Sequence, residues 1–163
     1  MVRSKLMVAL ACATLIACTG GMTQRERLIE QEVLQNRLAT WVRVTNNARV
    51  DSLMALYMPG SEVRVVRPDG QRLQGWEQLD EQVKYFYRSI NYMNFVMQDP
   101  TTVILSSEVA ISSFRHSTDI VAAGGVRRPV SAGWGTLVWL KDPQDNLWKI
   151  SLEHISTNAP AMN

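Results

Sequence analysis

The order of hydrophobic patterns along the chain constrains the fold more than any other feature of the sequence. Between Arg25 and Asn47, apolar residues recur every three or four positions, the spacing of a helix that buries one face. From Tyr92 to Thr157 the pattern changes to alternating segments rich in β-branched and aromatic residues, separated by turn signals. Helices followed by a run of strands favour an α+β architecture with helices packed on one face of a curved, mostly antiparallel sheet.

Shorter elements are predicted between and within these regions. Asp51 is expected to cap a second helix over 52–57, and Gly75 to open a third helix after a strand at 62–67 and a turn at 68–70. The later strands are expected at 92–98, 101–106, 109–121, 129–140 and 147–157, with Asp99-Pro100 as a turn. The chain has 163 residues and no internal repeat, so we expect a single domain over 25–158 and a tail at 159–163.

The N-terminal segment has the pattern of an export signal. Arg3 and Lys5 precede an uncharged run over 6–17, which is shorter than the roughly 20 residues that a membrane-spanning helix needs. The sequence Leu15-Ile16-Ala17-Cys18 resembles a bacterial lipobox, in which the cysteine is lipidated and becomes the new N-terminus. We therefore expect a signal peptide at 1–17, lipidated Cys18 with a tether over 18–24, and, since Thr19 is not acidic, an outer-membrane location facing the periplasm. The alternative is an ordinary secretory signal with Cys18 unmodified.

Charge and cysteine content exclude several classes of function. The full chain has 17 basic and 15 acidic residues, and removal of 1–17 removes Arg3 and Lys5, leaving 15 of each. A nucleic-acid-binding domain would carry clustered excess positive charge, so that class is disfavoured. Cys12 is removed with the signal, and acylated Cys18 is not free for a disulfide, a metal site or nucleophilic catalysis. The sequence predicts no cofactor and no metal site.

Four segments carry a resemblance to a known family: 46–57 (Asn-Asn-Ala-Arg-Val-Asp-Ser-Leu-Met-Ala-Leu-Tyr), 75–79 (Gly-Trp-Glu-Gln-Leu), 135–139 (Gly-Thr-Leu-Val-Trp) and 147–156 (Leu-Trp-Lys-Ile-Ser-Leu-Glu-His-Ile-Ser). In order and spacing they resemble the SnoaL-like branch of the nuclear transport factor 2-like (cystatin-like) fold. The resemblance covers roughly residues 25–157. It implies a cone of three helices and a bent sheet around a cavity. Isomerases, cyclases, dehydratases, hydrolases and non-catalytic binding domains share this fold, so it does not select a function.

The resemblance also permits a comparison with the ketosteroid isomerases, which use a tyrosine, a protonated aspartic acid and an aspartate base. Trp41 stands where their oxyanion tyrosine is expected, and Arg67 falls near their first-strand aspartate. An indole is not an acidic phenol, and an arginine is not a base below pH of about 12. The resemblance therefore implies that the isomerase chemistry is absent.

A ligand pocket is expected inside the cone, with an apolar, aromatic wall and a few polar groups. Arg67 is a candidate for pairing with a ligand carboxylate or phosphate, and the alternative is a solvated charge at a strand end. Most of the aromatic residues are also candidates for plain core packing. The predicted pocket residues are Trp41, Tyr57, Arg67, Tyr85, Tyr92, Trp134 and His154.

The two histidines are the candidates for acid–base chemistry. Strict alternation places His154 on the same face of the last strand as Trp148 and Ile150, and His116 on a neighbouring strand. If that face is concave, both imidazoles look into one cavity. The alternative is that His116 and His154 are structural or ligand contacts.

The same alternation places Leu137, Trp139 and Ile155 on the opposite, outward face, which suggests a homodimer through the sheet. Taken together, the sequence favours a non-catalytic, lipid-anchored envelope domain that binds a small, partly apolar ligand or a protein partner. The alternatives are a SnoaL-like enzyme of isomerase, cyclase or dehydratase type that uses pocket histidines, and an envelope scaffold or assembly subunit.

Overall fold

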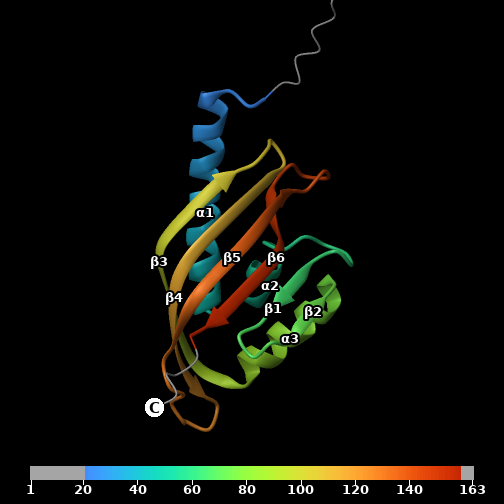
Figure 1. Ribbon diagram of the computed structural model, residues 1–163. Helices are drawn as coiled ribbons and strands as arrows, with labels where there is room; N and C mark the ends of the chain where they lie inside the picture. Colours follow the sequence, from blue (N-terminus) through green and yellow to red (C-terminus); the bar gives the residue numbers. More distant parts are fainter. Residues whose placement is uncertain (1–20, 159–163) are drawn as a thin grey trace, which may run out of the picture.

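The computed structural model describes residues 21–158, which form helices covering one face of a single sheet (Figure 1). The predicted signal peptide, Cys18 and the tail at 159–163 lie outside the described residues. None of the described helices combines the length and apolar character needed to cross a membrane. The elements in chain order are α1 (Gln24–Asn46), α2 (Val50–Met54), β1 (Arg64–Val66), β2 (Arg72–Gln74), α3 (Trp76–Arg88), β3 (Ile90–Ile104), β4 (Val109–Ala122), β5 (Ser131–Lys141) and β6 (Trp148–Thr157).

The long first helix is defined at its start by a capping box. The Thr23 side chain accepts a hydrogen bond from the Glu26 amide at 3.2 Å, and the Glu26 carboxylate accepts one from the Thr23 amide at 2.7 Å. These bonds satisfy two polar groups that a helix end leaves without partners. The buried face of α1 then packs against the sheet through Leu34, Leu38, Trp41, Val44 and Thr45.

The sheet has six strands in the order β2-β1-β6-β5-β4-β3, and every neighbouring pair is antiparallel except β1 with β6. Its concave face carries the core under the helices, where the largest fully buried side chains include Phe114, Leu137, Trp139, Trp148 and Ile150. The predicted α+β architecture, with helices on a curved and mostly antiparallel sheet, is confirmed.

Two predicted features of the strands are wrong. Asp99-Pro100 is not a turn between strands but a bulge inside β3, because Gln98 pairs with Arg115 and Thr101 with Ser113. Asp99 adopts a φ of 49°, and its carboxylate pairs with the Arg115 guanidinium on the neighbouring strand, which accommodates the extra residues. The short edge strand β2 is not among the predicted strands.

A second irregularity, in β6, reverses the predicted faces of that strand. Ile150 pairs with Trp139 and Leu152 with Val138, so Ser151 has no partner on β5. One extra residue moves every later side chain to the opposite face of the sheet. Glu153 and Ile155 therefore share the concave face with Trp148 and Ile150, and His154 is exposed on the convex face.

The outward apolar face predicted for the sheet is corrected for the same reason. Leu137 and Trp139 are fully buried and Ile155 is 8% exposed, all facing the helices. Trp134, on the other face of β5, is 57% exposed. The homodimer stays a prediction, but these three residues no longer support it.

Candidate functional site

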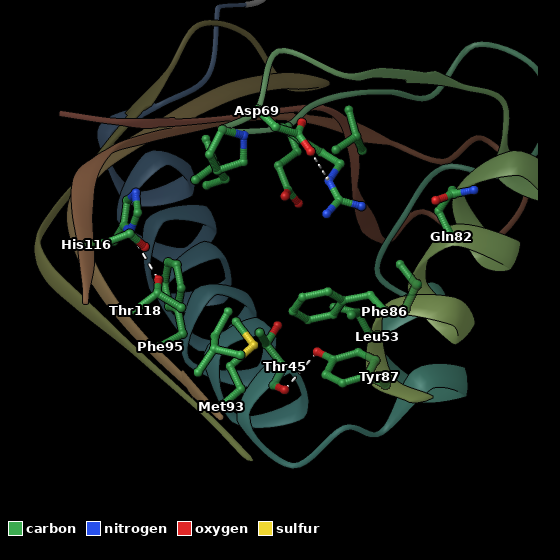
Figure 2. A pocket seen from close by; sticks show the side chains of 18 of the residues that line it. Thr45, Leu53, Asp69, Gln82, Phe86, Tyr87, Met93, Phe95, His116 and Thr118 are labelled. Carbon is green, nitrogen blue, oxygen red and sulfur yellow. Dashed lines mark hydrogen bonds and ion pairs between the residues drawn. The ribbon is translucent and has the colours of Figure 1, made fainter. Parts of the chain in front are cut away.

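A cavity of about 490 Å³ lies between the concave face of the sheet and the helices. Figure 2 shows side chains from opposite walls pointing into it, with Leu53, Phe86 and Tyr87 facing Met93 and Phe95. Most of the wall is apolar or aromatic. Its polar or charged members are Thr45, Tyr57, Arg67, Asp69, Gln82, His116, Thr118, Arg128, Ser131, Glu153 and Thr157, with Trp41 and Tyr87 contributing an indole N–H and a phenol.

The central polar feature of the wall is a chain of three side chains. The indole Nε1 of Trp41 donates to the Tyr57 hydroxyl at 3.1 Å, and that hydroxyl donates to the carboxylate of Glu153. Tyr57 is held in place by its neighbours, since the Met58 amide donates to the Ile150 carbonyl at 2.9 Å and the Ile150 amide donates to the Leu56 carbonyl at 2.7 Å. The segment after α2 is thus attached to β6, the strand that carries Glu153.

The surroundings of Glu153 change its acidity. Burial raises the pKa of Glu153 to about 7, although the hydrogen bond from Tyr57 and the positive charge of Arg67 oppose the change. Burial and, next, the negative charge of Glu153 raise the pKa of Tyr57 well above its ordinary value. A carboxyl group with this pKa exchanges protons near neutral pH, which is the property required of a general acid or base.

Arg67 follows the end of β1 and lines the cavity close to solvent. Its side chain is 30% exposed, its Nε lies 3.9 Å from the Asp69 carboxylate, and its guanidinium carbon lies 5.9 Å from the centre of the Phe86 ring. The dashed line to Asp69 in Figure 2 marks the ion pair. At 3.9 Å this pair is at the outer limit for an ion pair, so the guanidinium keeps donors for a ligand anion.

His116 also lines the cavity, but both ring nitrogens already have partners. Its Nε2 lies 3.0 Å from the Ser156 carbonyl and its Nδ1 lies 3.3 Å from the Thr118 hydroxyl. The Ser156 carbonyl accepts from a proton on Nε2, and the Thr118 hydroxyl can donate to Nδ1 or accept from it. The ring also stacks on Phe95, with centres 5.2 Å apart. These contacts hold the imidazole in a fixed orientation on the cavity wall.

Deeper in the cavity, one hydroxyl is unsatisfied. Thr45 is only 6% exposed, and within residues 21–158 its buried hydroxyl has no hydrogen-bond partner. The neighbouring Tyr87 hydroxyl donates to the Thr45 carbonyl at 2.8 Å, and burial raises the pKa of Tyr87 to about 12. Buried hydroxyls without partners are uncommon, so Thr45 is a candidate ligand contact.

The structure brings together some of the sequence-predicted site residues and separates others. Trp41, Tyr57, Arg67 and His116 line the cavity. Tyr85 is 69% exposed on α3, because its neighbours Phe86 and Tyr87 take the inward positions of the helix. The other three lie on the convex face of the sheet, where strand alternation and the β6 bulge place them: Tyr92, Trp134 and His154. His116 and His154 therefore do not share a cavity.

Sequence reasoning missed Glu153 and Thr45. Alternation counted from Trp148 places Glu153 on the outward face, and only the bulge at Ser151 turns it inward. No local sequence signal marks Glu153, because it takes a regular polar position after Lys149 and Ser151 in the alternation. Thr45 lies on the apolar stripe of α1, where its hydroxyl is the sequence signal that marks it as unusual.

No metal centre is formed by the part of the chain from 21 to 158, in which no three His, Cys, Asp or Glu side chains gather at ligating distance. Among protein-family models none matches this chain, and among curated proteins none matches either.

Solved structures do resemble it. One is a nuclear transport factor 2-like superfamily protein from Salmonella enterica, with a TM-score of 0.72, 19% identity, and coverage of 83% of this chain and 94% of that one. Another is a ketosteroid isomerase-like protein from Erwinia carotovora, with a TM-score of 0.67, 16% identity, and coverage of 80% and 98%. A third is a protein with a cystatin-like fold from Caulobacter vibrioides, with a TM-score of 0.68, 14% identity, and coverage of 80% and 90%. At these identities the likeness shows the fold alone.

Proposed function

We propose that this chain is a lipid-anchored protein of the bacterial cell envelope whose cavity binds a small, partly apolar ligand. It has the nuclear transport factor 2-like, cystatin-like fold, which carries both enzymes and non-catalytic proteins. The observation that carries the proposal is the cavity of about 490 Å³, which has an apolar wall interrupted by a few polar groups. This is the usual composition of a small-molecule site.

The polar groups suggest the chemistry of the ligand. Arg67, near solvent, suits an anionic group such as a carboxylate, since its own ion pair to Asp69 is long. Thr45 and Glu153 suit a hydroxyl or carbonyl on the buried part of the ligand, because one lacks a partner and the other holds a proton near neutral pH. An apolar body between two polar ends is the proposed ligand class.

The test uses 1-anilinonaphthalene-8-sulfonate, a fluorescent probe with an apolar aromatic body and one anionic group. Val83→Trp fills the cavity from α3 and should abolish the fluorescence increase, while Arg67→Gln should weaken binding by about tenfold, the value of one charge-assisted hydrogen bond. The matched control is Val126→Trp, on the exposed loop after β4, which should leave binding unchanged. Near-UV circular dichroism checks that each variant is folded. Unaltered binding by folded Val83→Trp would refute the proposal.

A second function, acid–base catalysis, is favoured by one observation. Glu153 has a pKa of about 7 and lines the cavity beside Tyr57, so its carboxylate can accept a proton from a bound carbon acid. This replaces the predicted histidine pair, because His154 lies outside the cavity. The test follows deuterium uptake by the α-carbon of cyclohexanone in deuterated buffer. Exchange that disappears in Glu153→Gln and persists in His154→Ala would support catalysis, whereas equal rates in all three proteins would count against it.

The proposed location rests on Leu15-Ile16-Ala17-Cys18 and the non-acidic Thr19. Mass spectrometry of the N-terminal peptide from membrane-purified protein should find a diacylglycerol on Cys18, and sucrose-gradient fractionation should place the protein with the outer membrane. A free Cys18 thiol, or an unprocessed N-terminus, would refute the anchor.

The proposed homodimer requires a convex sheet face that pairs with a second copy. That face exposes Tyr92, Val96 and Trp134. Sedimentation of the detergent-solubilised protein should give a dimer that Trp134→Arg converts to a monomer, because a charged group at the centre of an apolar interface is costly to bury. A monomer at all concentrations would exclude this pairing.

A further inference from the structure

The end of the domain where the chain enters α1 carries a group of exposed apolar side chains. Leu28 and Ile29 lie in the first turns of α1, Val103 and Leu105 at the β3–β4 turn, and Leu147 at the β5–β6 turn, each between 47% and 61% exposed. Figure 1 shows both turns at the same end of the molecule as the N-terminus of α1. We call this set of five residues the apolar end.

The apolar end is a single rigid platform and not three separate segments. The Arg27 guanidinium donates to the Ile104 carbonyl at 3.3 Å, which attaches α1 to the end of β3. The Trp148 indole donates to the Glu30 carboxylate at 2.6 Å, which attaches the start of β6 to α1. The Lys141 amide donates to the Glu108 carbonyl at 3.0 Å and joins the two turns. The exposed apolar groups are therefore held in fixed relative positions.

Three carboxylates beside the apolar end are paired with lysines. Glu30 pairs with Lys141, and Asp142 and Asp145 both pair with Lys149, the latter at 2.8 Å. Paired charges cost less to bring towards a region of low polarity than isolated ones. An apolar surface whose neighbouring carboxylates are in part paired with lysines is suited to the headgroup and acyl boundary of a bilayer.

The length of chain before α1 identifies the occupant of this surface. Thr23, the N-cap of α1, comes only five positions after Cys18, with four residues between them. Fully extended, five residues span at most about 18 Å. A lipid on Cys18, which is part of the proposed function on which this inference rests, would keep the apolar end within that distance of the membrane.

The opening of the cavity lies at the other end of the fold. Arg67 and Asp69 follow the end of β1, and Arg128 lies on the loop between β4 and β5, whereas the apolar end is at the opposite ends of these strands. From this geometry we infer that the apolar end inserts into the membrane interface and fixes the domain upright, with the cavity opening directed away from the bilayer. The lipid then sets the distance of the domain from the bilayer, and the apolar end sets the orientation of the domain.

The test uses the full acylated protein in vesicles of phosphatidylethanolamine and phosphatidylglycerol. Single nitroxide labels are placed through Leu105→Cys, Leu147→Cys and the control Val126→Cys, which lies on the loop at the cavity end. With Cys12 removed and Cys18 acylated, each introduced thiol is the only one available. All three positions are exposed, so labelling does not disturb the core.

On transfer from detergent to vesicles, the labels at 105 and 147 should collide several-fold less often with an aqueous nickel complex and more often with oxygen. The reason is that interfacial segments lie about 5–10 Å into the boundary between headgroups and acyl chains. The label at 126 should not change. Equal aqueous access at all three positions in acylated protein would overturn the orientation while leaving the anchor intact. Protection that depends on protein concentration in detergent would overturn it in favour of a second copy. A free Cys18 thiol would overturn the anchor and the inference with it.

Discussion

The Tyr57 hydroxyl donates a hydrogen bond to the Glu153 carboxylate although 96 positions separate the two residues in the chain. The bond joins the segment after α2 to β6 at the wall of the cavity, beside Trp41. It gives a partly buried carboxylate a defined partner and places a group with a pKa of about 7 where a ligand would bind.

The raised pKa of Glu153 predicts a specific dependence of stability on pH. Between its unfolded value near 4.5 and its folded value of about 7, the folded protein holds a proton that the unfolded chain has lost. Stability contributed by this group is complete below pH 4.5, falls as the pH rises to 7, and is then constant. The loss is at most about 3 kcal/mol.

Glu153→Gln removes that titration but keeps the shape of the side chain. Urea denaturation between pH 4.5 and 8 should show that the difference in unfolding free energy between variant and parent grows with pH in favour of the variant. The exposed Glu62→Gln provides the control, with no such trend. A pH-independent difference for Glu153→Gln would contradict the proposed ionisation.

Tyr57→Phe should destabilise the protein by about 1–2 kcal/mol, because the Trp41 indole loses its acceptor and Glu153 loses a donor. The pKa of Glu153 should also rise, since the Tyr57 hydrogen bond lowers it. Carbon-13 NMR titration of the Glu153 carboxyl measures this change. Tyr85→Phe, at an exposed position, should alter neither quantity. An unchanged or lower Glu153 pKa in Tyr57→Phe would be inconsistent with the hydrogen bond.

Ser112→Ala should cost about 1–3 kcal/mol, because it leaves the fully buried Trp139 indole N–H without its 2.9 Å acceptor. Ser113, the next residue, points to the other face and bonds only the exposed Thr101 hydroxyl at 2.9 Å. Ser113→Ala should therefore change stability by less than about 0.5 kcal/mol. Thermal unfolding of the pair distinguishes the two sites, and equal losses would argue against the buried bond.

Gly135→Ala should destabilise the domain by about 1–3 kcal/mol through overpacking. An added Cβ at Gly135 would lie 2.1 Å from Cε2 of Phe114, a ring that is completely buried. At Gly124, in the β4–β5 loop, the same methyl group meets nothing within 4 Å, so Gly124→Ala serves as the control. Chemical denaturation compares the two, and a neutral Gly135→Ala would show that Phe114 can move aside.

Much of the secondary structure could be predicted from the sequence because its causes are local. The period of apolar residues from Arg25 to Asn47 gives α1 to within one residue at each end. The glycine at 75 precedes α3, and the turn residues after β4 and β5 end those strands close to the expected places. The fold follows from the order of these elements.

The site depended on information that local patterns do not contain. Alternation predicts which side chains share a face only while the ladder has no extra residue, and the sequence around Ser151 does not mark the bulge. The bulge lies in a strand that pairs with β5 on one side and with β1 on the other. It turns Glu153 into the cavity and His154 out of it, and so exchanges the predicted acid–base group for another.

The sequence by itself thus determined the main elements, their order and the apolar residues available for a core, since periodicity acts over a few residues. Only the tertiary structure decided which polar groups meet inside the cavity. Tyr57 and Glu153 come together through pairings between distant segments, and burial there, a property of the whole fold, sets the acidity of Glu153.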